Sequence, residues 1–423
     1  MQFCSAFGTM AGKGSIVVGR DTRVSGLMAK HAVFSGLIAT GTEIIDLGIT
    51  TTPSVAIMVQ ELKVDGGIMI SASHNPIEWN ALKFFGSDGL LLNQKMSDEL
   101  LSIYNSGEYA YVDWDSLREP VMENRTEDLH IQKVFDLVNV DRIREAKFKI
   151  IVDSANGGGA SVTRRMLSKL NCNLTELNFD QNGYFVRDPE PSKENLKELC
   201  TMAAAGGYDI GFAQDPDADR LAVVSEKGEF IGEEYTLPLG AANVLSRKPT
   251  DIVVNLSTSR MIENVASAHS RKVYRSPVGE ANVVEVMKQK QCGFGGEGNG
   301  GVIDARAHLG RDSLVGIVLI LDLMAKTGKT VSELIADIPE YHMIKKKITV
   351  PSDKADAFIK KVKQEVSSAE MDFSDGVRME WDDRWIHLRP SNTEPVMRLI
   401  AEADSREKSL SLINEFTEKL IGE

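Results

Sequence analysis

The sequence predicts an α/β protein built from three similar α/β units with mixed sheets around a central cleft, plus a smaller C-terminal α+β domain. Three observations predict this class. Continuous apolar runs that each fit one buried strand recur along the chain, they alternate with stretches that fit helices, and each unit has a short strand that ends in an unusual polar loop. Apolar strands that alternate with helices indicate sheets covered on both faces.

Each predicted unit opens with a buried strand that runs into a polar or glycine-containing loop. The three strands begin at Ile16, Ile150 and Ile252. The stretches that follow fit helices, as residues 26–36 and 160–170 do. Later in each unit a short strand precedes the sequences SASHNP, QDPDADR and GEGNGG. This recurrence predicts one α/β unit used three times, with each copy contributing a loop to a common cleft.

The chain from about residue 340 onward has a different pattern. Residues 341–350 alternate like a strand, and residues 354–367 fit a helix. Two further apolar stretches, 385–388 and 396–400, flank the loop RPSNTEP, and residues 405–420 form a helical tail. The pattern predicts a separate, smaller α+β domain.

Length and composition limit the class of protein further. A chain of 423 residues is too long for one hydrophobic core, and a net charge of −13 argues against a nucleic-acid partner. The longest apolar run, residues 314–321, is too short for a bilayer span of about 20 residues, which predicts a buried helix and no membrane partner. The chain shows no signal peptide and its cysteines form no metal-ligand pattern, so we expect a reduced, cytoplasmic setting; the cysteines are Cys4, Cys172, Cys200 and Cys292.

The loop QDPDADR places Asp215, Asp217 and Asp219 at alternate positions. Three carboxylates that lie close together repel one another unless a cation sits among them, and a hard divalent cation prefers oxygen ligands. A calcium loop of the EF-hand type is disfavoured because Arg220 stands at the sixth position, where the turn needs glycine. The motif therefore predicts a divalent-cation site, with a solvated acidic turn as the alternative.

The loop SASHNP presents a hydroxyl and an imidazole directly after a buried strand. Ser73 lies beside His74, and Pro76 ends the strand. A serine nucleophile needs a base or an electrophile nearby, whereas serine and asparagine also satisfy backbone groups in ordinary turns. The residues themselves leave both interpretations open. Lys83 could bring a positive charge to the same site or could lie on the surface.

Three further loops carry polar groups suited to ligands. GEGNGG offers Glu297 and Asn299 among glycines, a combination that suits sugar hydroxyls, although a flexible turn has the same composition. RPSNTEP could grip a phosphate or could be a plain turn between strands; its candidate residues are Arg389, Ser391, Asn392 and Thr393. In GRDTRVSG, Asp21 can pair with Arg20 or Arg23, which favours a structural role for both arginines.

These five loops, in this order, resemble the α-D-phosphohexomutase superfamily, and most of all its archaeal phosphoglucosamine mutase/phosphomannomutase branch. The resemblance runs from about residue 15 to the C-terminus. It implies a mutase that interconverts hexose 6-phosphate and 1-phosphate, with glucosamine phosphate as the first candidate and mannose or glucose phosphate as the alternatives. It also implies four domains, I to IV, at residues 1–126, 127–235, 236–338 and 339–423.

The resemblance implies roles for individual residues. Ser73 would carry the phosphoryl group and would hold Mg²⁺ together with Asp215, Asp217 and Asp219. His74, Lys83 and Arg220 would supply positive charge or transfer protons. The sugar and its distal phosphate would be bound by Glu297, Asn299, Arg389, Ser391, Asn392 and Thr393. An activating hexose bisphosphate would be needed, the partners would be small sugar phosphates, and the chain could be a monomer or a homo-oligomer.

Two departures from the family pattern bear on function. The family opens with a strand and a glycine-containing loop that carries an arginine, so by fold analogy we expect about 30 residues before the helix-like start at Met1, and an unfilled edge in the first sheet. Gly301 stands where bacterial relatives place a histidine. The missing opening segment leaves a truncated, non-catalytic sugar-phosphate-binding paralogue as an alternative, and Gly301 leaves the choice among glucose, mannose and glucosamine phosphates open. A metal-dependent sugar phosphatase that uses the same serine is a separate alternative, which a second phosphate site disfavours.

Overall fold

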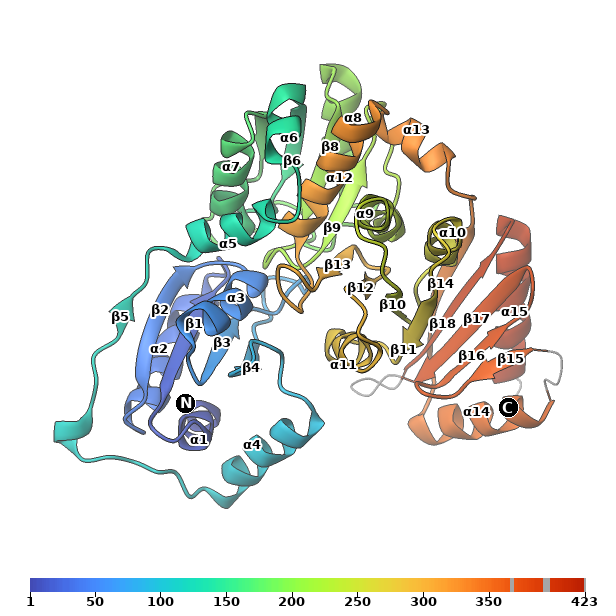
Figure 1. The fold of residues 1–423 in the computed structure, drawn as a ribbon. Helices are drawn as coiled ribbons and strands as arrows, with labels where there is room; N and C mark the ends of the chain where they lie inside the picture. Colours follow the sequence, from blue (N-terminus) through green and yellow to red (C-terminus); the bar gives the residue numbers. More distant parts are fainter. Residues whose placement is uncertain (366–368, 391–395, 422–423) are drawn as a thin grey trace.

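The computed structural model describes residues 1–365, 369–390 and 396–421. Its sheets follow one another in an arc, from the N-terminal sheet at one end to the C-terminal sheet at the other (Figure 1). The first three sheets are mixed and carry helices, and the fourth is antiparallel. The predicted fold class is confirmed.

The first sheet has the strand order β4-β3-β1-β2-β5. Its strands are β1 (Ser15–Arg20), β2 (Glu43–Ile49), β3 (Gly66–Ile70), β4 (Leu82–Gly86) and β5 (Val121–Met122), and its helices are α1 (Gln2–Met10), α2 (Ser25–Ile38), α3 (Thr52–Leu62) and α4 (Gln94–Ser106). All of β3 is buried, as its apolar sequence predicts. On its outer side β2 pairs with only the two residues of β5, so most of the backbone along this edge of the sheet has no neighbouring strand among the described residues.

The second and third sheets repeat the same topology. The second has the order β7-β6-β8-β9, and the third has the order β11-β10-β12-β13. Their strands are β6 (Lys149–Asp153), β7 (Asn173–Leu177), β8 (Ile210–Gln214), β9 (Leu221–Val224), β10 (Ile252–Asn255), β11 (Val273–Ser276), β12 (Phe294–Glu297) and β13 (Gly301–Asp304). In each of the three units an antiparallel hairpin joins the third and fourth strands: β3–β4, β8–β9 and β12–β13. The three polar loops follow the third strand of each unit, so the predicted repeat is confirmed.

The helices of the second and third units are α5 (Thr126–Phe135), α6 (Val140–Ala146), α7 (Gly159–Lys169), α8 (Lys197–Gly206), α9 (Thr236–Leu245), α10 (Met261–Ala268), α11 (Glu280–Lys290), α12 (Ser313–Thr327) and α13 (Val331–Ala336). Most of these helices share one apolar core, whereas α8 and α11 pack in two smaller clusters on the other faces of their sheets. The apolar run 314–321 lies in the buried helix α12. Asp312 caps its N-terminus, where the carboxylate accepts hydrogen bonds from the N–H groups of Leu314 and Val315. Among the described residues, no helix has the length and apolar character that a membrane span requires.

The fourth sheet separates apolar from polar side chains on its two faces. Its order is β14-β18-β17-β16-β15, with β14 (His342–Thr349), β15 (Glu370–Asp372), β16 (Val377–Glu380), β17 (Arg384–Pro390) and β18 (Val396–Ala403). Helices α14 (Ser352–Glu365) and α15 (Arg406–Ile421) cover the apolar face. The other face meets the third unit through polar contacts: Arg378 donates to the carbonyl of Leu256 (2.7 Å), and His387 lies 2.8 Å from the hydroxyl of Ser257.

Candidate active site

Loops of the first three sheets and strand residues of the fourth line one cleft of about 570 Å³. His74 comes from the β3–β4 loop, Arg220 lies at the end of the β8–β9 loop, Asn299 lies between β12 and β13, and Arg389 lies near the end of β17. The cleft therefore brings together described residues of the serine, aspartate and sugar loops and Arg389 at the start of the predicted phosphate loop. The predicted residues Ser391, Asn392 and Thr393 lie outside the described residues.

A buried arginine holds the serine loop in place. Arg23 and Asp21 form a fully buried ion pair at 3.0 Å. The Arg23 guanidinium also donates to the carbonyls of Ser73 (2.6 Å), Asn75 (2.8 Å) and Pro76 (2.7 Å). Ser73 itself has a φ of 50°, a left-handed conformation that is uncommon outside glycine and recurs at functional sites. The structural role predicted for Arg23 is confirmed, and its effect is to fix the backbone around Ser73.

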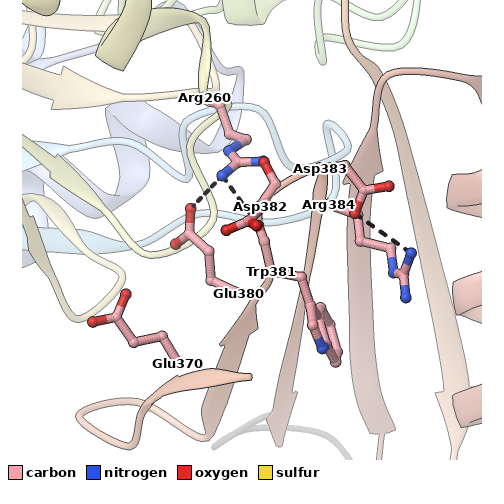
Figure 2. Close-up of a pocket in the computed structure, with 7 residues that line it drawn as sticks. All are labelled: Arg260, Glu370, Glu380, Trp381, Asp382, Asp383 and Arg384. Atoms are coloured by element: carbon pink, nitrogen blue, oxygen red, sulfur yellow. Dashed lines mark hydrogen bonds and ion pairs between the residues drawn. The ribbon is translucent and has the colours of Figure 1, made fainter. Parts of the chain in front are cut away.

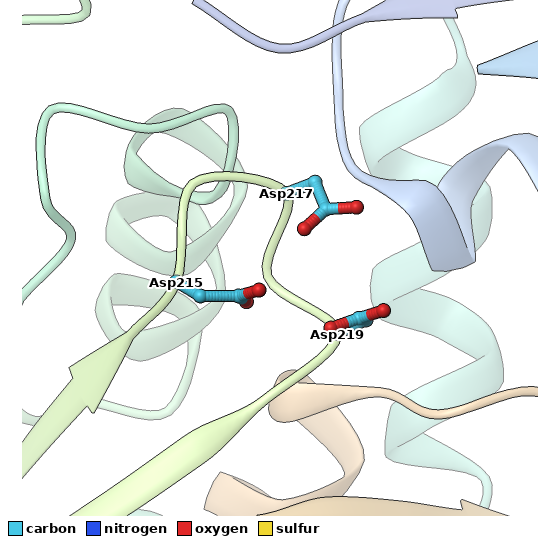
Figure 3. A group of neighbouring side chains, drawn as sticks. All are labelled: Asp215, Asp217 and Asp219. Carbon is cyan, nitrogen blue, oxygen red and sulfur yellow. The ribbon is translucent and has the colours of Figure 1, made fainter. Parts of the chain in front are cut away.

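Asp215, Asp217 and Asp219 all point into one small volume (Figure 3). All three are fully buried, and one carboxylate oxygen from each lies within 4.8 Å of the other two. The hydroxyl of Ser73 donates to Oδ2 of Asp215 at 2.8 Å, although the two residues are 142 positions apart. The structure thus brings the predicted serine to the predicted cation ligands.

A glycine lets the neighbouring backbone approach the aspartate loop. The N–H of Gly158 donates to the carbonyl of Pro216 at 2.7 Å. A Cβ at Gly158 would lie 2.2 Å from the carbonyl oxygen of Thr50, which is closer than non-bonded atoms pack. The glycines before α7 therefore allow the first and second units to meet around the aspartate loop.

The positive charges around the aspartates are distributed unevenly. Lys83 Nζ lies 2.6 Å from Asp217 Oδ2 and 3.5 Å from Asp219 Oδ2. Burial would raise the pKa of Asp219, but Arg311, Lys83 and Arg220 hold it below its ordinary value. The pKa of Asp215 lies well above its ordinary value because of burial and because of Asp219 and Asp217. Asp215 is therefore the carboxylate that most needs a further positive charge.

The oxygen atoms that remain fit a divalent cation. Asp217 Oδ1 and Asp219 Oδ1 are buried and have no hydrogen-bond partner among the described residues. Buried carboxylate oxygens without partners are costly, and hard cations such as Mg²⁺ are bound by such oxygens. The donor set therefore fits Mg²⁺, and Asp215, Asp217 and Asp219 are the residues that would hold it.

His74 and Arg220 flank the Ser73 hydroxyl. His74 Nδ1 lies 3.4 Å from Ser73 Oγ. Burial and the charge of Arg220 lower the pKa of His74 to about 4, so its imidazole is neutral at pH 7. The backbone N–H of Arg220 donates to Asp215 Oδ1 at 3.1 Å, and its guanidinium lies 3.9 Å from Asp219.

The sugar loop is rigidly tied to its surroundings. Glu297 is buried, and its Oε1 accepts hydrogen bonds from Asn255 (2.8 Å) and from the N–H of Gly279 (2.9 Å). Its Oε2 accepts from Arg311 at 2.7 Å. Asn299 accepts from the N–H of Gly301 at 3.2 Å and lines the cleft. Both predicted side chains therefore lie at the cleft in defined orientations.

Sequence reasoning missed several charged residues at the cleft. They are Glu234, Glu280, Arg311, Lys345 and Arg398. Arg398 lies directly opposite Arg389 in the pairing of β17 with β18, and its buried Nε has no hydrogen-bond partner among the described residues. Two guanidinium groups on neighbouring strands repel each other, and Asp375, 2.7 Å from Arg389, offsets only part of their charge. Alternate side chains of β18 point to opposite faces of the sheet, so the sequence could have grouped Arg398 with its neighbours on one face. Nothing in the sequence showed that this face borders the cleft.

A second pocket lies away from these loops. It has a volume of about 490 Å³ and is drawn in Figure 2. Arg260 lies 3.2 Å from Glu380 and also donates to the carbonyl of Asp382, and Arg384 lies 3.4 Å from Asp383. Its guanidinium groups are thus paired with neighbouring acids, and no described residue of the predicted loops lines it. The cleft is the stronger candidate site.

Together the four sheets and the shared cleft define a protein of the phosphohexomutase class. Family models for phosphoglucomutase/phosphomannomutase match the chain in order: alpha/beta/alpha domain I at residues 1–110, domain II at 128–228, domain III at 233–341 and the C-terminal domain at 346–419. The chain belongs to the phosphoglucomutase/phosphomannomutase family, within the α-D-phosphohexomutase superfamily that its resemblance indicated.

Individual relatives agree with this assignment. The probable phosphoglucosamine mutase of Methanopyrus kandleri is 36% identical over 98% of this chain and 91% of the relative. A phosphoglucomutase/phosphomannomutase of Thermococcus kodakarensis is 36% identical over 96% of this chain and 90% of the relative. The crystal structure of a phosphoglucomutase/phosphomannomutase family protein from Burkholderia thailandensis superposes with a TM-score of 0.85 at 25% identity, over 99% of this chain and 93% of that one. These relatives are named as mutases, so the chain is a member of an isomerase family.

Proposed function

We propose that this protein is a Mg²⁺-dependent hexose-phosphate mutase that interconverts 6-phosphates and 1-phosphates through a phosphorylated Ser73 and a bisphosphorylated sugar. The observation that carries the proposal is the 2.8 Å contact between Ser73 and Asp215, in a loop bordering the cleft that also contains Arg389. Glucosamine phosphate is the first candidate substrate, with mannose and glucose phosphates as alternatives. We further propose four domains that meet near residues 126, 235 and 338.

The proposed transfer needs positioning and charge more than covalent chemistry. The bond from Ser73 Oγ to phosphorus breaks as a bond from a sugar hydroxyl oxygen to phosphorus forms, and the proton that the sugar hydroxyl loses to a base is then delivered to the departing Ser73 Oγ. His74 is neutral at pH 7 and lies next to Ser73, so we assign it that proton. Lys83 and Arg220 supply positive charge beside the transferred group. Bound Mg²⁺ would neutralise charge on the phosphoryl oxygens.

A second anion site is required because the bisphosphorylated sugar carries a phosphate at each end. Arg389 and Arg398 provide two guanidinium groups at the side of the cleft formed by the fourth sheet. After the first transfer the intermediate turns end for end, and the phosphate that was held by these arginines goes back to Ser73. The polar interface between the fourth sheet and the third unit supports a movement that accompanies this turn.

The two alternatives differ from this proposal in outcome. A sugar phosphatase would pass the phosphoryl group to water, and the second anion site would be superfluous. A non-catalytic paralogue would bind sugar phosphates without turnover. The paired arginines and the serine beside unpartnered carboxylates both favour the mutase.

The test is a coupled assay with glucosamine, glucose and mannose 1-phosphates, in the presence of Mg²⁺ and a hexose bisphosphate. We expect conversion to the 6-phosphate by the wild-type protein and by Ser106→Ala, which changes an exposed serine at the end of α4. Ser73→Ala should lose activity by orders of magnitude. Normal isomerisation by Ser73→Ala would exclude the mechanism, and release of inorganic phosphate faster than isomerisation would favour the phosphatase.

A further inference from the structure

One arginine touches both the aspartate loop and the sugar loop. Arg311 lies between β13 and α12, and its side chain is only 11% exposed. Nη2 lies 2.7 Å from Asp219, Nη1 lies 2.7 Å from Glu297, and Nε lies 2.9 Å from Glu280, the first residue of α11. Each of its three nitrogens is thus committed to a different carboxylate.

Gly301 provides the space that Arg311 occupies. A Cβ at this position would lie 2.3 Å from Cδ and 2.9 Å from Cγ of Arg311. Both distances are shorter than real Cβ contacts, so a side chain at position 301 and Arg311 in its present place exclude each other. The glycine in the sugar loop therefore has a structural consequence: an arginine from outside the loop fills the volume beside it.

Arg311 determines which carboxylate oxygens remain available. Asp219 Oδ2 accepts hydrogen bonds from Arg311 and Lys83, while Asp219 Oδ1 has no hydrogen-bond partner among the described residues, only Arg220 at 3.9 Å, and can face a cation. At Glu297, Arg311 holds Oε2 while Asn255 and Gly279 hold Oε1. Because the guanidinium is planar and rigid, a shift of one carboxylate displaces the nitrogen that holds the other.

We propose that Arg311 is a positioning residue that couples cation binding at the aspartate loop to the orientation of Glu297 in the sugar loop. The inference deepens the proposed function, since it takes these two loops as the cation and sugar sites. Among the described residues, Arg311 is the one side chain that donates hydrogen bonds to both Asp219 and Glu297. Coupling of this kind is reciprocal. A change in the orientation of Glu297 changes the affinity for the cation, and cation binding changes the strength of the contact between Arg311 and Glu297.

The test is a double-mutant cycle read out by Mg²⁺ binding to the full chain, measured by titration calorimetry without sugar. Glu297→Gln removes one of the three carboxylates that Arg311 contacts. Arg311 then pairs more strongly with Asp219 and competes with the cation for that carboxylate. We expect this change to weaken Mg²⁺ binding about three- to tenfold when Arg311 is present. In the Arg311→Met background the effect of Glu297→Gln should fall to less than about twofold.

Two further variants keep the test decisive. Arg311→Lys retains the charge but cannot hold three carboxylates, so it should lose the coupling even if Arg311→Met does not fold. Arg306→Met removes an arginine of the same segment that pairs with Asp304 instead, and it should leave both the Mg²⁺ affinity and the effect of Glu297→Gln unchanged.

An equal effect of Glu297→Gln with and without Arg311 would overturn the inference, as would no effect in either background or no Mg²⁺ binding by the wild-type protein. Mutase activity is assayed separately on the wild-type sample. A protein that binds Mg²⁺ with the predicted coupling but has no mutase activity would refute the proposed function and leave the role of Arg311 intact.

Discussion

Asp215 is the one member of the aspartate triplet for which the structure records no ion pair among the described residues. Asp217 contacts Lys83, and Asp219 contacts Lys83 and Arg311. Replacement of Asp215 by asparagine therefore removes charge repulsion without breaking an ion pair. We predict that Asp215→Asn stabilises the metal-free protein and abolishes its response to Mg²⁺.

The size of the effect follows from the geometry. With oxygens within 4.8 Å of one another, each pair of carboxylates repels by at least about 3 kcal/mol at an effective dielectric constant of about 20. A buried carboxyl relieves part of this repulsion by taking up a proton, so we expect a net gain of about 1–3 kcal/mol for Asp215→Asn. Asp217→Asn makes the same charge change but removes the partner of Lys83 at 2.6 Å, so it should cost about 3–5 kcal/mol.

The assay is thermal unfolding in EDTA and in excess Mg²⁺. In EDTA, Asp215→Asn should unfold several degrees above the wild type and Asp217→Asn below it, since about 1 kcal/mol moves Tm by roughly 2–8 °C. In Mg²⁺ at about 100 times Kd the wild type should gain about 2.7 kcal/mol, and both variants should lose this gain. The reasoning is refuted if Asp215→Asn unfolds at or below the wild-type temperature in EDTA, or if it keeps the Mg²⁺ response.

Three further predictions concern other parts of the molecule. Burial lowers the pKa of His387 to about 4, so the unfolded chain takes up a proton at a higher pH than the folded protein does. The contribution of neutral His387 to the free energy of unfolding is fully present above pH 6.5. It should fall by up to about 3 kcal/mol as the pH drops from 6.5 to 4. Urea unfolding at pH 7 and pH 5 should show this loss, and His387→Gln should reduce it. Arg398→Met removes a charged group from the proposed distal-phosphate site and should lower kcat/KM at least about tenfold with little change in Tm; an unchanged kcat/KM would contradict the second anion site. Gly158→Ala places a Cβ 2.2 Å from the carbonyl of Thr50, so it should cost about 1–3 kcal/mol in denaturant unfolding, whereas wild-type stability would contradict the close approach.

The repeated architecture could be predicted because its signals are local. Strands such as β3 are continuous apolar runs, and each ends in a polar loop that proline or glycine makes incompatible with further strand. The aspartate triplet could be predicted for the same reason, since alternate positions in a short loop between two strands bring the three carboxylates together. The prediction that Ser73 joins them depended on the family resemblance, because 142 residues separate Ser73 from Asp215.

The residues that sequence reasoning missed act through contacts between units. Arg311 stands in a segment with no distinctive motif, and only the structure shows that it reaches Asp219 and Glu297. Lys345 lies on a strand rich in lysine, and its contacts to Glu233 and Glu234 at 3.1 Å depend on how the fourth sheet meets the rest of the chain. A single charged residue carries no local pattern that separates such a contact from an exposed side chain.

The most direct test of the central claim is a single-turnover experiment with protein that carries a labelled phosphoryl group on Ser73. Mixed with hexose 1-phosphate and Mg²⁺, it should lose the label from the serine as labelled hexose bisphosphate forms, and the label should then appear in hexose 6-phosphate. Label that stays on the protein, or leaves it as inorganic phosphate without passing through a sugar, would contradict transfer from this serine to the bound substrate.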